Sequence, residues 1–477
     1  RGALRHRLYC IRRRKNGHRD SNNNDNGNNH RSGSYPARTV LQKEQKLTNH
    51  TIYGGKSMKK VIIRLAAALF AAVICISFAA CAINKGDGDS NKGESNTTFP
   101  TSSSGEETAG FTAEEVTAPI DRSGQNMRLG AYLWYGFVSC AGLTNRHIEE
   151  FYEYREPLWG YGYCDIEEME YQIQLAYDFG LDFFAIDYYA SINEGYGSVP
   201  ADYFVEAKNS NLLDFCLLVV NADAATTPSQ ATWDIACKNY IHYMTQPNAL
   251  KVDGKPVIIF ITPYNLIDYM GGVENTKNAL DDLEQQMIAL GYPGIVVLGC
   301  DSPYGDALGN IDYNENNFNK SVFANRIKRY ESAGFDGFTG YNYRQINMYE
   351  DENGNKSYET PYKYLSWTHE NCWKAFSDYT DSIYMPALLG GWDDRPRETE
   401  IAGYSCYAPD RTGDDFCQHI LNSYEWIKQN SDSAVDNLAV IYAWDEIDEG
   451  GYIIPTKGEG FEMLEGLKKA ASIINGK

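Results

Sequence analysis

The sequence predicts an α/β protein whose main domain, residues 121–477, is a single (β/α)8 barrel of the TIM type preceded by a disordered tether. Two observations support this fold class. Eight short apolar runs alternate with amphipathic stretches of helical period, which is typical of a parallel sheet covered by helices. Polar and aromatic residues then gather at the downstream ends of these runs, as expected where barrel strands end on one rim.

The predicted strands are aliphatic at their beginnings. They span 129–136, 181–190, 214–223, 256–264, 294–302, 336–343, 384–393 and 438–446. Helices are predicted between them, for example over 165–180 and 278–291, each ending at a glycine. Eight such units favour closure of the sheet into a barrel. Residues 349–361 are expected to form a hairpin about Asn353-Gly354, in the loop after the sixth strand.

The segment before the barrel divides into three parts. Residues 1–57, with "RRRK" and an asparagine tract, are predicted to be disordered. They fit either an over-extended gene model or a basic arm for nucleic acid, and the better start at Met58 favours the former. Residues 58–80 have the basic head and short apolar core of a signal peptide. Residues 81–120 are rich in Gly, Ser, Thr, Asn and Glu and predict a flexible tether.

The end of the signal peptide predicts a lipid anchor. The tetrad from Phe78 to Cys81 resembles a bacterial lipobox, with Phe in place of the commoner Leu. We therefore expect lipidation at Cys81 and an extracytoplasmic protein anchored to the bacterial cell membrane or outer membrane.

Charge restricts the class of partner. The whole chain has a formal net charge of −21, but residues 81–477 hold 61 acidic and 27 basic residues, a net charge of −34. Such a domain is not expected to bind nucleic acid by counterion release. A neutral or cationic partner fits better, and we expect a monomer.

No metal, nucleotide or flavin motif is present in the sequence, so no cofactor is predicted. The cysteines form no C-x-x-C pair and no zinc-like cluster with histidine. Cys216 and Cys300 lie in apolar runs and are expected to be small buried residues. A disulfide between Cys140 and Cys164 is an open alternative.

The strand ends supply the candidate substrate-binding residues. Aromatic faces with polar edges suit sugar rings, although a single Asp or Asn at a strand end can equally cap a helix or start a turn. Arg395 in "GGWDDRPR" can alternatively tie the barrel rim together. The candidates are Trp134, Tyr135, Asp187, Tyr188, Tyr189, Asn221, Tyr341, Trp392, Asp393, Arg395, Trp444 and Asp445.

The stretch "VIYAWDEIDEGGYIIP", residues 440–455, places four acidic side chains behind an apolar run. If the eighth strand continues through Glu446, alternation puts Trp444 and Glu446 on one face. A helix-like turn after Glu446 would bring Glu449 back towards it, since residues three apart lie about 5–6 Å apart at Cβ. Two such carboxyls match the pair of a retaining glycosidase. A calcium loop or a solvated turn is the alternative, although Ile447 breaks the alternation of an EF-hand.

"WDEIDEGGYIIP" resembles a motif of the glycoside hydrolase family 99-like proteins, including the WbsX type. Their last strand ends in Asn-Glu-aromatic-x-Glu-Gly followed by an apolar residue and proline. Four further segments are similar to that group in the right order, "GLDFFAIDYY", "KVDGKPVIIF", "GFDGFTGYNY" and "GGWDDRPR", and the resemblance extends from Arg128 to the C-terminus. The group is related to endo-α-mannosidases.

The resemblance implies a role for each glutamate. Glu446 would deprotonate the 2-hydroxyl of the sugar, which attacks the anomeric carbon with overall retention, and Glu449 would protonate the leaving oxygen. Asp445 stands where Asn is usual, Ile447 replaces the aromatic residue, and Asp448 is an extra acid. More negative charge beside Glu449 is expected to help keep it protonated.

The sequence thus predicts a surface-anchored hydrolase of α-linked oligo- or polysaccharides, with mannose-containing glycans as the expected substrates. A WbsX-type glycosyltransferase in polysaccharide assembly is one alternative, although an export route disfavours nucleotide-sugar donors. A non-catalytic glycan-binding lipoprotein is another.

Overall fold

In the computed structural model, the described residues are 119–135, 148, 150–161, 165–192, 199–305, 310–311, 313, 318–397 and 405–476. Residues 1–57, the predicted signal peptide 58–80, nearly all of the predicted tether, Cys81, Cys140 and Cys164 lie outside them. None of the helices in the described ranges combines the length and hydropathy needed to cross a membrane.

The described residues form a sheet of eight parallel strands, the seventh in two pieces. In chain order these are β1 (Arg128–Leu133), β2 (Phe183–Tyr188), β3 (Asp214–Val219), β5 (Lys255–Phe260), β6 (Val296–Cys300), β8 (Gly337–Thr339), β12 (Ile383–Tyr384) with β13 (Ala387–Leu389), and β14 (Leu438–Tyr442). Each falls within or overlaps one predicted apolar run. The predicted strands are therefore confirmed.

The seventh strand closes the barrel because its two pieces pair with different neighbours. β12 pairs with β8, β13 pairs with β14, and β14 pairs with β1. The amide of Met385 donates to the carbonyl of Phe338 at 2.8 Å, and the carbonyl of Pro386 accepts from Val440 at 2.9 Å. Proline has no amide hydrogen, but its carbonyl still serves the ladder. The predicted (β/α)8 fold is confirmed.

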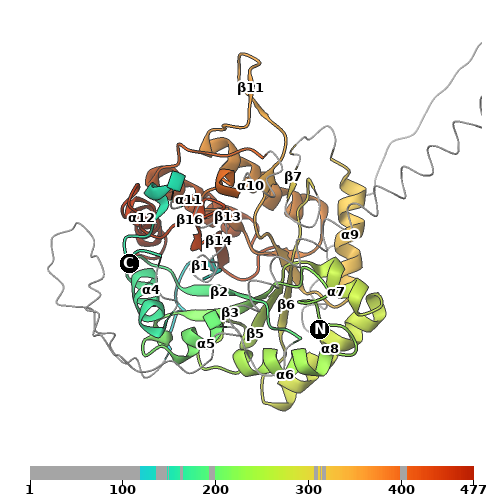
Figure 1. Ribbon diagram of the computed structural model, residues 1–477. Coiled ribbons are helices and arrows are strands. Elements are labelled where there is room, and N and C mark those ends of the chain that lie inside the picture. Colours follow the sequence, from blue (N-terminus) through green and yellow to red (C-terminus); the bar gives the residue numbers. More distant parts are fainter. Residues whose placement is uncertain are drawn as a thin grey trace, which may run out of the picture. The chain divides into compact units, whose positions relative to one another are not determined.

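Helices surround the sheet in the described part of the chain (Figure 1). They are α4 (Ile166–Asp178), α5 (Val199–Glu206), α6 (Trp233–Met244), α7 (Pro263–Tyr269), α8 (Val273–Ala289), α9 (Lys320–Ser332), α10 (Tyr362–Tyr379), α11 (Gly413–Gln429) and α12 (Glu462–Asn475). The Asp165 side chain caps α4 by accepting from the amide of Glu168 at 2.8 Å. Gly180, just beyond the end of α4, has φ +92°.

Short pairs of strands lie on the loops. β10 (Tyr349–Glu350) pairs with β11 (Lys356–Ser357), and Gly354 in their turn has φ +82°, which confirms the predicted hairpin. In Figure 1 this hairpin projects away from the barrel. β4 (Lys251–Val252) precedes β5, and β7 (Asn310–Ile311) pairs in parallel with β9 (Arg344–Gln345).

Side-chain alternation divides the core into two layers. On β2, Phe183 and Ala185 belong to the cluster inside the barrel, whereas Phe184 and Ile186 pack in the outer layer beneath the helices. Asp187 continues the inner row and Tyr188 the outer one. Cys216 and Cys300 are buried in the inner cluster, as predicted.

Candidate functional site

The acidic stretch forms a hairpin rather than a longer eighth strand. β14 ends at Tyr442, and β15 (Asp445–Glu446) pairs with β16 (Gly451–Tyr452). A turn closes where the amide of Gly450 donates to the carbonyl of Ile447 at 3.2 Å. The buried Ile447 side chain packs in the outer core and anchors this turn.

Trp444 and Glu446 therefore do not share a face, and that expectation is wrong. Trp444 lies in the outer core, with its indole nitrogen 2.7 Å from Gln172 Oε1 and its ring against Phe184. Glu446 instead contacts Tyr341, which packs against the inner cluster. The alternation of β14 is lost because the strand ends before the hairpin begins.

Glu446 is buried, with a relative exposure of 4 %. Its Oε1 accepts from the Tyr341 hydroxyl at 2.6 Å, and its Oε2 has no hydrogen-bond partner among the described residues. Burial raises the pKa of Glu446 to about 8, helped by the charge of Asp448 and opposed by Arg397. At neutral pH the free protein therefore holds Glu446 mainly in its neutral form.

Glu449 has a contrasting environment. Its Oε1 accepts from Arg397 in an ion pair, and its Oε2 accepts from the Tyr442 hydroxyl and, at 3.4 Å, from the Asn342 amide. Three donors on one carboxyl group stabilise the charged form. The Glu449 side chain is 14 % exposed, more than any buried acid around it.

Arg397 also neutralises the extra acid of the turn. Its Nε donates to Asp448 Oδ2 at 2.6 Å, while its other nitrogen holds Glu449. The expectation that Asp448 would help to keep Glu449 protonated is therefore not supported by the contacts. The guanidinium group of Arg397 contacts both Asp448 and Glu449 and lies between them.

Asp187 lies beside Glu446. Its Oδ2 is 3.3 Å from the Tyr341 hydroxyl, and its Oδ1 is buried without a partner. Tyr189 is near both acids, since burial and then the charges of Asp187 and Glu446 raise the pKa of its phenol. Tyr189 also hydrogen-bonds with Trp134. The structure thus brings these five residues together at the carboxyl end of the strands.

Asp445 is a support of the site. Its two carboxyl oxygens accept from the backbone amides of Trp134 at 2.9 Å and Tyr135 at 2.7 Å, which fixes the end of β1 to the hairpin. Burial raises the pKa of Asp445 to about 7, while these amides oppose that rise. Asp445 is fully buried, so its oxygens face protein rather than a ligand.

The loop after β13 packs on the hairpin through two glycines. A Cβ on Gly391 would lie 2.5 Å from the carbonyl oxygen of Gly450, and a Cβ on Gly450 would lie 2.6 Å from the amide nitrogen of Asp393. That amide donates to the carbonyl of Glu449 at 2.7 Å. Such an approach leaves no room for side chains at the two glycines.

Arg155 and Arg395 hold the same loop through Asp393. Arg155 is buried, forms an ion pair with Asp393, and donates to the carbonyls of Asp393 and Ile447 at 3.0 Å each. Arg395 makes a two-pronged contact with Asp393 at 2.7 and 2.8 Å and covers the Tyr407 ring. These contacts agree with the rim-tying interpretation of Arg395.

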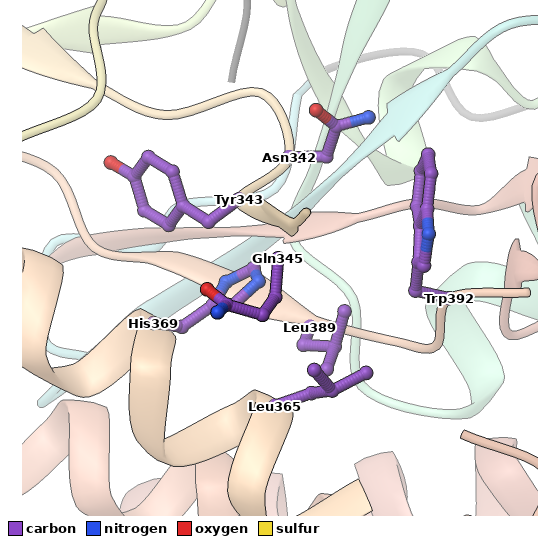
Figure 2. A pocket seen from close by; sticks show the side chains of 7 residues that line it. All are labelled: Asn342, Tyr343, Gln345, Leu365, His369, Leu389 and Trp392. Atoms are coloured by element: carbon purple, nitrogen blue, oxygen red, sulfur yellow. The ribbon is translucent and has the colours of Figure 1, made fainter. Parts of the chain in front are cut away.

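A small pocket lies beside Asn342, and neither of the two glutamates lines it (Figure 2). Trp392 and Asn342 line it, and Asn342 also reaches Glu449. The Trp392 ring is tilted against that of Tyr442 at 5.9 Å, and its indole nitrogen donates to Ser405. The other lining residues are Tyr343, Gln345, Leu365, His369 and Leu389.

Several predicted residues lie away from this cluster. Tyr188 packs outside the barrel against Tyr240 and Tyr243 of α6. Tyr135 donates to the carbonyl of Asp165 at 3.0 Å. The side chain of the fully buried Asn221 makes two hydrogen bonds with the backbone of Thr262, at 2.7 and 3.0 Å. Trp444, described above, is the fourth.

Sequence reasoning left four residues out of the candidate site, namely Arg155, Asn342, Arg397 and Tyr442. Alternation from Leu438 and Val440 could have placed Tyr442 on the inner face, since all three belong to the inner cluster. Asn342 and Arg397 lie inside quoted motifs, "GYNY" and "GGWDDRPR". No local signal marks Arg155, whose partners lie more than two hundred residues away.

The fold and the site define a (β/α)8 barrel with a cluster of acids and aromatic residues at the carboxyl ends of its strands. This arrangement is typical of barrel enzymes. The profile of the family described as Glycosyltransferase WbsX matches residues 149–467, and the chain belongs to that family. The WbsX-type resemblance found in the sequence is thereby confirmed. No curated protein sequence matches the chain.

Solved structures with a similar overall arrangement are glycoside hydrolases of low sequence identity. A glycoside hydrolase-like protein has a TM-score of 0.49 at 14 % identity, covering 75 % of this chain and 97 % of its own. The family 99 endo-alpha-mannosidase from Bacteroides thetaiotaomicron has a TM-score of 0.46 at 12 % identity, covering 72 % and 95 %. A family 1 β-glucosidase from Thermotoga maritima has a TM-score of 0.38 at 9 % identity, covering 73 % and 97 %.

Proposed function

We propose that the protein hydrolyses glycosidic bonds in α-linked glycans, with Glu446 and Glu449 as its two catalytic carboxyls. The observation that carries the proposal is the contrast between these two side chains. Glu446 is buried with one unpartnered oxygen, and Glu449 is paired with Arg397. Hydrolysis of a glycoside needs one protonated and one ionised carboxyl at the same bond, and contrasting environments are how a protein keeps two carboxyls in different states.

The contacts of the free protein favour Glu446 as the proton donor. Tyr341 occupies Oε1, so the acid proton belongs on Oε2, which has no acceptor in the described part of the protein. In this scheme Oε2–H gives its proton to the leaving oxygen as the anomeric C–O bond breaks. Glu449 removes a proton from the attacking hydroxyl, which is the 2-hydroxyl of the sugar if the family resemblance holds. Water then attacks the anomeric carbon and gives its proton to Glu446, while Glu449 returns the proton it took to the oxygen at position 2.

These roles are the reverse of those that the resemblance implies, in which Glu449 is the acid. The two schemes contain the same number of protons and differ in which carboxyl carries the shared one. Each predicts a different response to the leaving group, so kinetics can separate them.

The site also suggests what kind of ligand it takes. Asp187 Oδ1, Glu446 Oε2 and Asp448 Oδ1 are buried acceptors without partners. Hydroxyl groups of a neutral sugar can donate to such oxygens, whereas an acidic sugar would be repelled. Together with the resemblance, this favours a neutral glycan, with mannose as the first sugar to test. Anchoring through a lipidated Cys81 outside the cytoplasm remains part of the proposal.

The test compares Glu446→Gln and Glu449→Gln on a panel of α-linked glycans and on activated aryl glycosides, with product stereochemistry followed by NMR. Each variant is expected to lose about 10²–10⁴ in rate on natural glycans. Loss of the acid matters less when the leaving group needs no proton. Glu446→Gln should therefore recover more activity on the aryl glycoside than Glu449→Gln, and the opposite ranking would assign the acid role to Glu449.

The family description favours a second candidate, transfer of a sugar from an activated donor. A pyrophosphate donor needs cationic partners, and Arg397, the cation beside the two glutamates, is already paired with Asp448 and Glu449. Incubation with nucleotide-sugar donors and an acceptor glycan tests this alternative. Product from a donor, with no cleavage of any glycan in the panel, would replace hydrolysis as the function. Glycan binding without turnover of either kind would indicate a non-catalytic receptor.

A further inference from the structure

The Tyr341 hydroxyl lies between two buried carboxyl groups. It is 2.6 Å from Glu446 Oε1 and 3.3 Å from Asp187 Oδ2. A phenol has one hydrogen, so it can donate to only one of them. The shorter contact takes it. The contact with Asp187 is then attractive only if Asp187 supplies a hydrogen to the phenol oxygen, because otherwise two lone pairs face each other.

The surroundings of Asp187 also favour a neutral acid. Asp187 is 2 % exposed on the inner face of β2, and none of the described cations forms an ion pair with it. An ionised carboxylate buried without a cation is costly. Burial raises its pKa well above the usual range, followed by the charge of Glu446. The titratable groups that face it are Glu446 and Asp445 on β15, Glu449 in the turn, Tyr341 after β8 and Tyr189 after β2.

The groups around Glu446 determine its orientation. Asp448 and Asp445 add negative charge, and Arg397 is the cation that opposes them. Among the described residues, Tyr341 is the hydrogen-bond donor to Glu446, and it reaches only Oε1. The orientation of Glu446 therefore depends on where the hydrogen of Tyr341 points.

We propose that Asp187 is held as a neutral carboxylic acid and that a hydrogen-bond chain from Asp187 through Tyr341 to Glu446 Oε1 positions Glu446. The chain leaves Glu446 Oε2 as the oxygen that exchanges a proton with the substrate, and this use rests on the proposed function. Asp187 and Tyr341 are positioning residues in this scheme. No proton leaves Asp187 during turnover, since its role is to donate a hydrogen bond. Each bond in such a chain polarises the next and strengthens it.

The test measures the pH profile of kcat/KM for Asp187→Asn and Asp187→Leu, on a glycan that the parent cleaves. The profile limb due to Glu446 is identified first as the limb lost in Glu446→Gln. The Asn amide can donate to the Tyr341 oxygen as a neutral acid does, so this limb should stay within about 0.3 pH unit and kcat/KM within about threefold. Leu has a similar volume but no donor. Its limb should move to higher pH, with kcat/KM lower by about tenfold or more.

Two results would overturn the proposal. If Asp187 is ionised in the native protein, Asp187→Asn removes a negative charge beside Glu446, and the limb moves to lower pH by about one unit. If Asn and Leu give the same profile, the donor at this position has no role. Asp301→Asn is the control for a buried strand-end carboxyl outside the site, and its folded fraction should keep the parent profile.

A readout without turnover keeps this inference separate from the proposed function. The comparison is made at neutral pH, where the hydrogen-bond chain requires a neutral Asp187. An infrared difference spectrum between the parent and Asp187→Asn should then contain the carbonyl stretch of one neutral carboxyl group. Its absence would refute the chain, even in a protein that cleaves no glycan. Its presence with no glycan cleavage would support the neutral acid and remove only the catalytic role.

Discussion

Asp187 and Asp301 occupy equivalent places at the carboxyl ends of two barrel strands, and each is 2 % exposed. Asp301 faces outward and accepts from Arg326 of α9 through both oxygens, at 2.5 to 3.1 Å. Asp187 faces inward and has Tyr341 instead of a cation. The outward acid connects the sheet to a helix, and the inward acid belongs to the candidate site. The same residue type at the same rim therefore forms an ion pair with a helix in one place and contacts the candidate site in the other.

The largest expected difference between them is in stability. Asp301→Asn leaves Arg326 without its partner carboxylate and is expected to lower the free energy of unfolding by about 3–5 kcal/mol. Asp187→Asn removes no ion pair of the described residues and should lower it by less than about 1 kcal/mol. Urea unfolding of both variants at neutral pH measures the two values. Equal losses would mean that Asp187 is also a structural ion-pair partner.

A second prediction concerns the stability cost of the inward acids. The pKa of Glu446 is raised from an ordinary value of 4.5 to about 8 in the folded protein. The raised pKa of Glu446 favours the folded state below pH 4.5, and this contribution to the free energy of unfolding is lost progressively as the pH rises through 8. Glutamine cannot ionise, so Glu446→Gln does not lose this stability. The free energy of unfolding of the variant, relative to that of the parent, should be higher at pH 8 than at pH 5 by about 1–3 kcal/mol. Chemical unfolding at both pH values tests this gain, and a constant difference would place the Glu446 pKa near its usual value.

The smallest expected effect sharpens the distinction between inner and outer rows. Tyr188 is the outward neighbour of Asp187, packs against α6 and hydrogen-bonds with Asn239. Tyr188→Phe should cost about 1 kcal/mol of stability through that bond and leave kcat/KM unchanged within about twofold. Tyr341→Phe is the inward counterpart. It should lower kcat/KM at least tenfold, because Glu446 loses the hydrogen bond that orients it.

Strand positions could be predicted because each barrel strand is a continuous apolar run, and its length and period survive in the sequence. The facing of Asp187 follows from the same period. Two features could not be predicted. The end of β14 at Tyr442 depends on the pairing of Asp445 with Tyr452, so alternation carried through Trp444 gave the wrong face. The ion pair of Glu449 depends on Arg397, which is brought to it from the loop after β13. Contacts of this kind join segments that are far apart in the sequence, so they form only when the rim is folded.

The pairing of the first barrel strand with the last has a consequence for how the protein is made. In the folded barrel β1 pairs with β14, so that Arg128 is the partner of Leu438 although most of the domain lies between them in the sequence. A ribosome adding about 5–20 residues per second exposes the unpaired edge of β1 for many seconds before that partner emerges. The acidic hairpin emerges after β14, so the cluster of candidate residues around Glu446 and Glu449 assembles only with the final stretch of synthesis.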